Sequence, residues 1–188
     1  MISARHLASS LYGLWLLLRW DASGFGYFER NFGGFWRSYF VAFTLAPLYL
    51  AHSVAAFDAT TAKESMAHHF ASEAVAYVLS WTVFPFAMMH VTRLLQRELR
   101  FFDYFVAYNW FQLAIGLVLL PILLLADVGL MTPESAVFLN FIILGVFFAY
   151  GVFIARHGLD VTLATGVGIV LFDTVLSMIV RQIVDLAG

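Results

Sequence analysis

Long apolar runs with almost no charged side chains constrain this sequence more than any other feature. Residues 113–126 form one such run without a single polar side chain. A helix that crosses a membrane needs about 20 predominantly apolar residues. The composition agrees, because 62% of the residues are hydrophobic and only 12% are charged, whereas a soluble domain carries about 25% charged residues. The sequence therefore predicts a multi-pass membrane protein, and it excludes a disordered chain, a disulfide scaffold and a zinc–thiolate protein.

The apolar runs predict an all-α fold, an integral membrane bundle of five transmembrane helices. Thr132, Pro133 and Glu134 form a helix-start pattern of capping residue, first-position proline and acidic first turn. Gly158 is expected to end that helix and Asp160 to cap the next, so the last two spans should form an antiparallel hairpin. Within a transmembrane domain of residues 35–188, the predicted spans are residues 35–57, 70–95, 101–126, 133–156 and 161–186.

Residues 1–34 differ from the rest of the chain and are predicted to form a separate segment. Leucines at helical spacing, with polar residues beside them, are typical of an amphipathic helix that lies in the membrane interface. The apolar core of this helix is too short to span a membrane. Glycine and aromatic residues then alternate over residues 24–36, which we expect to form a flexible belt on the membrane surface. The leucines that define the helix are Leu7, Leu11, Leu14 and Leu18.

Basic residues are distributed unequally between the two ends of the predicted spans. Loops on the cytoplasmic side of a membrane carry an excess of lysine and arginine. A cytoplasmic N-terminus puts eight of the ten basic residues on that side and leaves Lys63 and Arg181 on the other. We therefore predict an inner-membrane protein with a cytoplasmic N-terminus and a periplasmic C-terminus. The eight residues are Arg5, Arg19, Arg30, Arg37, Arg93, Arg97, Arg100 and Arg156.

A carboxylate near the middle of the fifth span is the least expected charge in the sequence. Asp173 lies roughly 20 Å along the helix from Asp160, at 1.5 Å per residue. A charge at that depth must be protonated, paired or in contact with water. We predict a polar cluster of Asp173 with Asn109 and Gln112 of the third span, with Ser177 on the same face. The cluster fits either a proton or cation relay or a hydrogen bond that fixes helix packing.

Five arginines near the predicted cytoplasmic ends of the spans could bind anionic lipid headgroups. The alternative is that they only set the orientation of the chain, which requires no ligand. These candidates for headgroup binding are Arg30, Arg37, Arg93, Arg97 and Arg100.

A weaker pattern near the predicted outer surface suggests a metal. His52 lies near the end of the first span, while His69 and Glu73 lie one helical turn apart at the start of the second. Histidine and carboxylate side chains are suitable ligands for zinc. The pattern has no third ligand at a fixed spacing, and histidine pairs in loops are common.

No catalytic constellation is present in the sequence. It contains no phosphate-binding glycine loop in a suitable context and no metalloprotease helix. We therefore predict a protein without catalytic residues, cofactors or enzymatic activity, and without a nucleic-acid partner.

The amphipathic N-terminal segment followed by five closely spaced spans resembles the layout of small bacterial five-span membrane proteins of the Yip1 type. The resemblance implies a non-enzymatic membrane protein that acts through lipid or protein partners. Our leading hypothesis is an inner-membrane accessory or scaffold protein that binds another membrane protein, a second copy of itself or membrane lipids. The alternative is a small transporter or proton-coupled subunit that uses Asp173 with Asn109 and Gln112.

Overall fold

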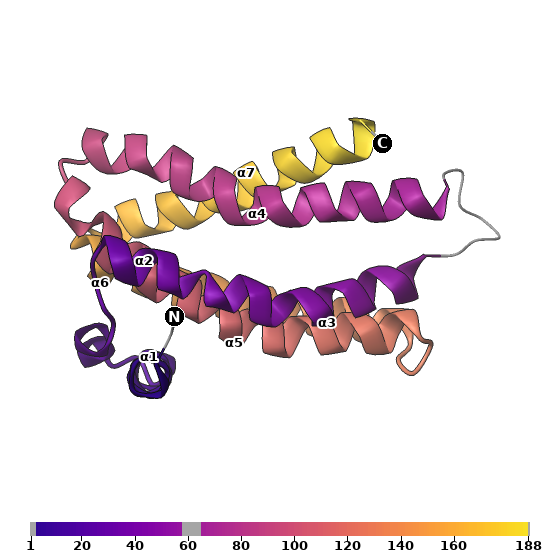
Figure 1. Ribbon diagram of the computed structural model, residues 1–188, viewed down its shortest axis with the longest axis horizontal. Helices are drawn as coiled ribbons and strands as arrows, with labels where there is room; N and C mark the ends of the chain where they lie inside the picture. The colour runs from indigo at the N-terminus through magenta and orange to yellow at the C-terminus, as the bar shows by residue number, and fades with distance from the viewer. Residues whose placement is uncertain (1–2, 58–64, 188) are drawn as a thin grey trace.

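The computed structural model describes residues 3–57 and 65–187, and these residues form helices and connecting turns without any β-strand (Figure 1). Five helical segments are long and apolar enough to cross a membrane, which confirms the predicted all-α fold with five such helices. Lys63, which entered the orientation argument, lies outside the described residues. The elements are α1 (Ala4–Leu18), η1 (Ala22–Tyr27), α2 (Phe32–Ser38), α3 (Phe40–Ala56), α4 (Met66–Leu94), η2 (Glu98–Arg100), α5 (Phe101–Asp127), α6 (Pro133–Leu159) and α7 (Leu163–Ala187).

Side-chain caps explain why several helices begin where they do. The Thr132 hydroxyl accepts a hydrogen bond from the Ser135 backbone N–H at 3.3 Å, and Pro133 takes the first helical position, as predicted. The predicted end of α6 is wrong, because Gly158 lies inside the helix and Asp160 ends it with a left-handed φ of 54°. Gly158 is needed for packing, since a methyl group there would lie 2.9 Å from the Cα of Tyr104.

Helix α5 is the central element, in contact with α1, α2, α3, α4 and α6. Its side chains Tyr104, Phe105, Trp110 and Phe111 are almost completely buried. Large apolar side chains elsewhere face outward, and Phe141 of α6 is 79% exposed. An apolar core with an apolar outer surface is the pattern expected of helices surrounded by lipid.

The N-terminal segment packs against one end of the bundle. Figure 1 shows α1 nearly end-on while the long helices run across the view, so the axis of α1 crosses theirs. The Tyr150 hydroxyl of α6 donates a hydrogen bond to the carbonyl of Leu18 at 2.6 Å. Close contact between α1 and η1 depends on glycine, because a methyl group on Gly24 would lie 2.6 Å from the Gly13 carbonyl oxygen.

The glycine and aromatic segment is therefore more regular than the flexible belt that we predicted. It forms η1 and α2, and Phe25, Phe28 and Phe35 are buried in the core. The Asp21 carboxylate accepts a hydrogen bond from the backbone N–H of Ser23 at 2.9 Å, which fixes the start of η1. Glycine spacing suggested flexibility, but the glycines instead permit close approach between helices.

We call one end of the bundle the arginine-rich end. It comprises the start of α2, the end of α4, η2, the start of α5 and the connection from α6 to α7. Contacts across it include Arg30 with Asp103 at 3.4 Å, and Arg97 Nε with the Asp160 carbonyl at 3.1 Å.

Candidate functional site

An apolar groove of about 380 Å³ opens between α2, the last turns of α4 and the start of α5 at the arginine-rich end. Aromatic and aliphatic side chains form most of its lining, and one arginine and one glutamate stand among them. Concave apolar sites with a few placed polar groups are the usual form of a ligand site. The lining residues are Phe32, Phe35, Trp36, Tyr39, Thr82, Pro85, Phe86, Met89, Thr92, Arg93, Glu98, Phe101 and Phe102.

Helix α2 forms one wall of the groove, and its first turn fixes the position of that wall. The Asn31 side chain accepts a hydrogen bond from the backbone N–H of Gly34 at 2.9 Å. Gly34 lies so close to the preceding turn that a methyl group on it would overlap the carbonyl group of Glu29. The ring of Phe35 then packs on that of Phe101 of α5, with their centroids 5.8 Å apart.

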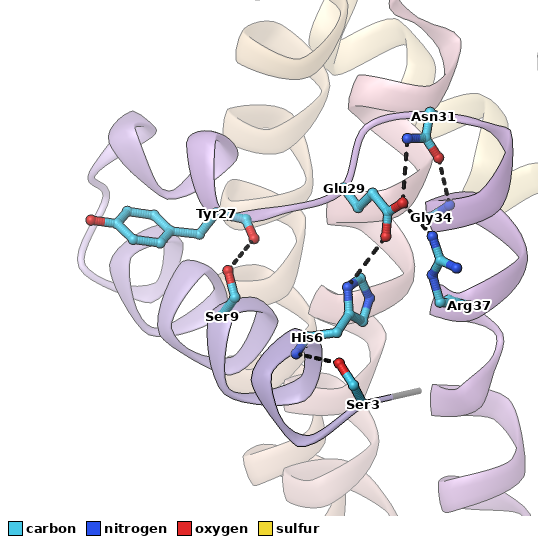
Figure 2. A network of polar contacts seen from close by, with 8 residues as sticks. All are labelled: Ser3, His6, Ser9, Tyr27, Glu29, Asn31, Gly34 and Arg37. Atoms are coloured by element: carbon cyan, nitrogen blue, oxygen red, sulfur yellow. Dashed lines mark hydrogen bonds and ion pairs between the residues drawn. The ribbon is translucent and has the colours of Figure 1, made fainter. Parts of the chain in front are cut away.

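A polar network behind this wall connects α1 to α2 (Figure 2). His6 Nδ1 lies 3.3 Å from Glu29 Oε2, while Arg37 forms an ion pair with the other carboxylate oxygen. Asn31 Nδ2 also donates to Glu29 at 3.4 Å. Partial burial favours a higher pKa for Glu29, but the hydrogen bonds from Arg37 and Asn31 outweigh it and hold the pKa below its ordinary value. The ionised carboxylate of Glu29 thus joins α1, α2 and the turn that precedes α2.

The five arginines that we predicted to bind headgroups differ in their interaction partners. Arg30 and Arg100 share the carboxylate of Asp103, at 3.4 and 3.1 Å. Arg37 pairs with Glu29, and Arg97 donates to the carbonyl of Asp160. Arg93 is exposed and forms no ion pair or hydrogen bond with its guanidinium within the described residues. Of the five, Arg93 is also the one that lines the groove.

Glu98 lies at the mouth of the same groove, five residues after Arg93 in the sequence. It is exposed, and its carboxylate has no ion-pair partner in the part of the chain that the structure describes. The groove therefore combines an apolar interior with one free positive and one free negative group at its mouth. This combination suits an amphiphile whose polar end carries charge.

The structure changes the predicted cluster around Asp173. The carboxylate of Asp173 accepts a hydrogen bond from the hydroxyl of Tyr108 at 2.8 Å, and Gln112 follows Tyr108 one turn later on α5. Asn109 instead donates to the buried Ser38 hydroxyl at 2.8 Å. Adjacent residues on a helix point about 100° apart, so Tyr108 faces α7 while Asn109 faces α2. Ser177 is exposed and lines a smaller cavity towards the opposite end.

The three candidate metal ligands do not form a metal site from the described residues. His52 Nδ1 lies 2.5 Å from Asp127, and His69 Nε2 lies 3.3 Å from the Ser53 hydroxyl. Within residues 3–57 and 65–187, no three histidine, aspartate or glutamate side chains are placed to bind one metal ion. Each of the three side chains has structural partners of its own, and the metal site stays a prediction.

Glu73 belongs to a network that sequence reasoning missed. It accepts a hydrogen bond from the Tyr49 hydroxyl at 2.6 Å and pairs with Arg181 at 2.7 Å. Arg181 also pairs with Asp185 one turn later, at 3.0 Å. The network joins α3, α4 and α7. The available signal was the placement of one acid and one base inside apolar helices, where each requires a partner.

Comparisons of the chain with protein-family models, with curated proteins and with solved structures found no match. The resemblance to Yip1-type proteins therefore stays a prediction, and function is inferred from the chemistry of the described residues.

Proposed function

We propose that this protein is a multi-pass accessory protein of the inner membrane that holds a membrane lipid in the groove between α2, α4 and α5. In this proposal the N-terminus and the arginine-rich end are cytoplasmic, and the protein organises lipid without catalysing a reaction. Five apolar helices and an exposed apolar surface support the membrane location. The distribution of arginine supports the orientation.

The single observation that carries the proposal is the groove itself, with its apolar lining and the free Arg93 at its mouth. An acyl chain fits the aromatic interior, while a lipid phosphate can pair with the guanidinium in the headgroup layer. Lipid tails around a membrane protein are as apolar as its side chains, so tight retention requires packing and polar contacts beyond simple hydrophobicity. The groove offers both.

Filling the groove is expected to release the lipid. Met89 lines the groove, and Met89→Trp places a larger side chain where the acyl chain would lie. A loss of 1 kcal/mol of packing corresponds to about a fivefold fall in retained lipid. Native mass spectrometry of the full chain, released from its own membranes in mild detergent, measures the fraction with lipid bound.

The matched control is Met178→Trp, which makes the same change on the exposed surface of α7 away from the groove. This control should retain as much lipid as the unmodified protein. Equal lipid retention by Met89→Trp and Met178→Trp would contradict the proposed function.

A second candidate function is proton-coupled transport, and the pair of Asp173 with Tyr108 favours it. A cavity of about 140 Å³ lies beyond Asp173 along α7, and Ser80, Ser177 and Arg181 contribute to its lining. Asp173, Ser177 and Arg181 are spaced four residues apart, so they share one face of α7. Polar residues aligned along one helix face in a membrane can form an ion pathway.

If this second function operates, Asp173→Asn should abolish proton-coupled flux in liposomes, because asparagine cannot exchange a proton in this way. The amide oxygen can still accept the Tyr108 hydrogen bond, so the fold should persist. Asp160→Asn is the control, since it makes the same change at an exposed residue between α6 and α7, outside the face that carries Asp173 and Arg181. Unchanged proton flux in Asp173→Asn would eliminate this candidate.

A further inference from the structure

The mouth of the groove carries two charges of opposite sign that no side chain neutralises within the described residues. Arg93 lies in the last turn of α4 and Glu98 begins η2, and both line the groove. The other candidate arginines are occupied by Asp103, Glu29 or the Asp160 carbonyl. Arg93 and Glu98 do not pair with each other, so each remains available to a ligand in the headgroup layer.

We infer that the groove selects a phospholipid with a zwitterionic phosphoethanolamine headgroup, an inference that rests on the proposed lipid-binding function. The phosphate of this headgroup is an acceptor for the Arg93 guanidinium. Its primary ammonium carries three N–H donors and complements the Glu98 carboxylate. This headgroup thus carries a partner for each of the two charges that line the groove.

Other common headgroups satisfy only part of this arrangement. A phosphoglycerol headgroup brings a negative charge for Arg93 but no cation for Glu98, so the carboxylate and the lipid repel each other. A phosphocholine headgroup brings a cation that has no N–H group to donate to Glu98. The apolar lining contacts only the acyl chain and does not distinguish lipids with identical chains. Headgroup preference therefore depends on Arg93 and Glu98.

The test offers the full-length purified chain an equimolar mixture of phosphatidylethanolamine, phosphatidylglycerol and phosphatidylcholine with identical acyl chains. Native mass spectrometry then gives the ratio of the bound lipids. We expect phosphatidylethanolamine to exceed each of the others about threefold, a ratio within the range of one exposed charge pair. Glu98→Gln should bring the ratio to phosphatidylglycerol close to one, and Arg93→Gln should lower the retention of all three phospholipids.

Matched controls are Glu134→Gln at the opposite end of the bundle and Arg156→Gln at the arginine-rich end, neither of which lines the groove. Both should keep the preference of the unmodified chain. Equal retention of the three lipids, or an unchanged ratio in Glu98→Gln, would overturn the headgroup inference. If lipid is bound without preference but is still lost in Met89→Trp, lipid binding by the groove stands and only the inference fails. If the unmodified chain retains no lipid, both fail.

Discussion

Replacement of Gly34 by alanine is expected to displace α2 and to abolish lipid retention in the groove. The added methyl group would overlap the Glu29 carbonyl and lie 2.6 Å from its carbon atom. Neither partner is the end of a flexible side chain, so the backbone of α2 or of the preceding turn must move. Overpacking of this kind costs about 1–3 kcal/mol. The movement also carries Phe35 and Trp36 away from the groove that they line.

Gly33→Ala provides a control at the neighbouring residue with the same change in side chain. Its methyl group would meet side-chain atoms only, the Arg37 guanidinium at 3.0 Å and the Asn31 amide oxygen at 3.3 Å, and a shift of a few tenths of an ångström in these side chains accommodates it without breaking the ion pair to Glu29. Thermal unfolding in detergent should show a lower midpoint for Gly34→Ala than for Gly33→Ala, and native mass spectrometry should show lipid loss only in Gly34→Ala. Equal unfolding midpoints and equal lipid retention would show that the position of α2 does not depend on Gly34.

Trp110→Ala is expected to cause the largest loss of stability among single substitutions in α5. Trp110 is fully buried in the core around the central helix, so its removal leaves a cavity. In a membrane the cost arises mainly from lost packing contacts, since water exclusion does not drive helix association there. Truncation of a buried tryptophan costs about 3 kcal/mol or more.

Two comparisons make this second prediction specific. Trp15→Ala removes the same side chain from an exposed site on α1 and should change stability far less. Trp110→Phe should also cost less than Trp110→Ala, because it keeps an aromatic ring and the indole N–H has no hydrogen-bond partner within the described residues. Unfolding titrations with a denaturing detergent measure all three variants. Similar losses in Trp15→Ala and Trp110→Ala would contradict the central role of α5.

The helices could be predicted from the sequence because each depends on local information. Apolar runs mark the five long helices, and Thr132 with Pro133 marks the start of α6. The end of α6 could not be predicted in the same way. Glycine is a common residue at the end of a helix, so Gly158 was predicted to be a cap. Its close contact with Tyr104 instead involves α5, a helix far away in the sequence.

The candidate site was predicted only in part, since it depends on which helix faces meet. The five arginines were found from their positions in the sequence. Four of them pair with Glu29, Asp103 or the Asp160 carbonyl, and the spacing of the residues does not reveal this pairing. Adjacent residues of α5 face different neighbours, so Tyr108, and not Asn109, points towards Asp173. Sequence identified which groups need partners, whereas helix packing decided which partners they receive.

The ion pair between Glu73 and Arg181 has a consequence for how the proposed membrane protein is assembled. A charged residue inside a membrane helix adds as much as about 3 kcal/mol to the cost of inserting that helix alone. Arg181 of α7 is neutralised by Glu73 of α4, which is synthesised more than one hundred residues earlier. Helix α4 thus provides the counter-ion that lowers the cost of inserting α7. Helix α7 therefore reaches its most stable position only when α4 is already in place.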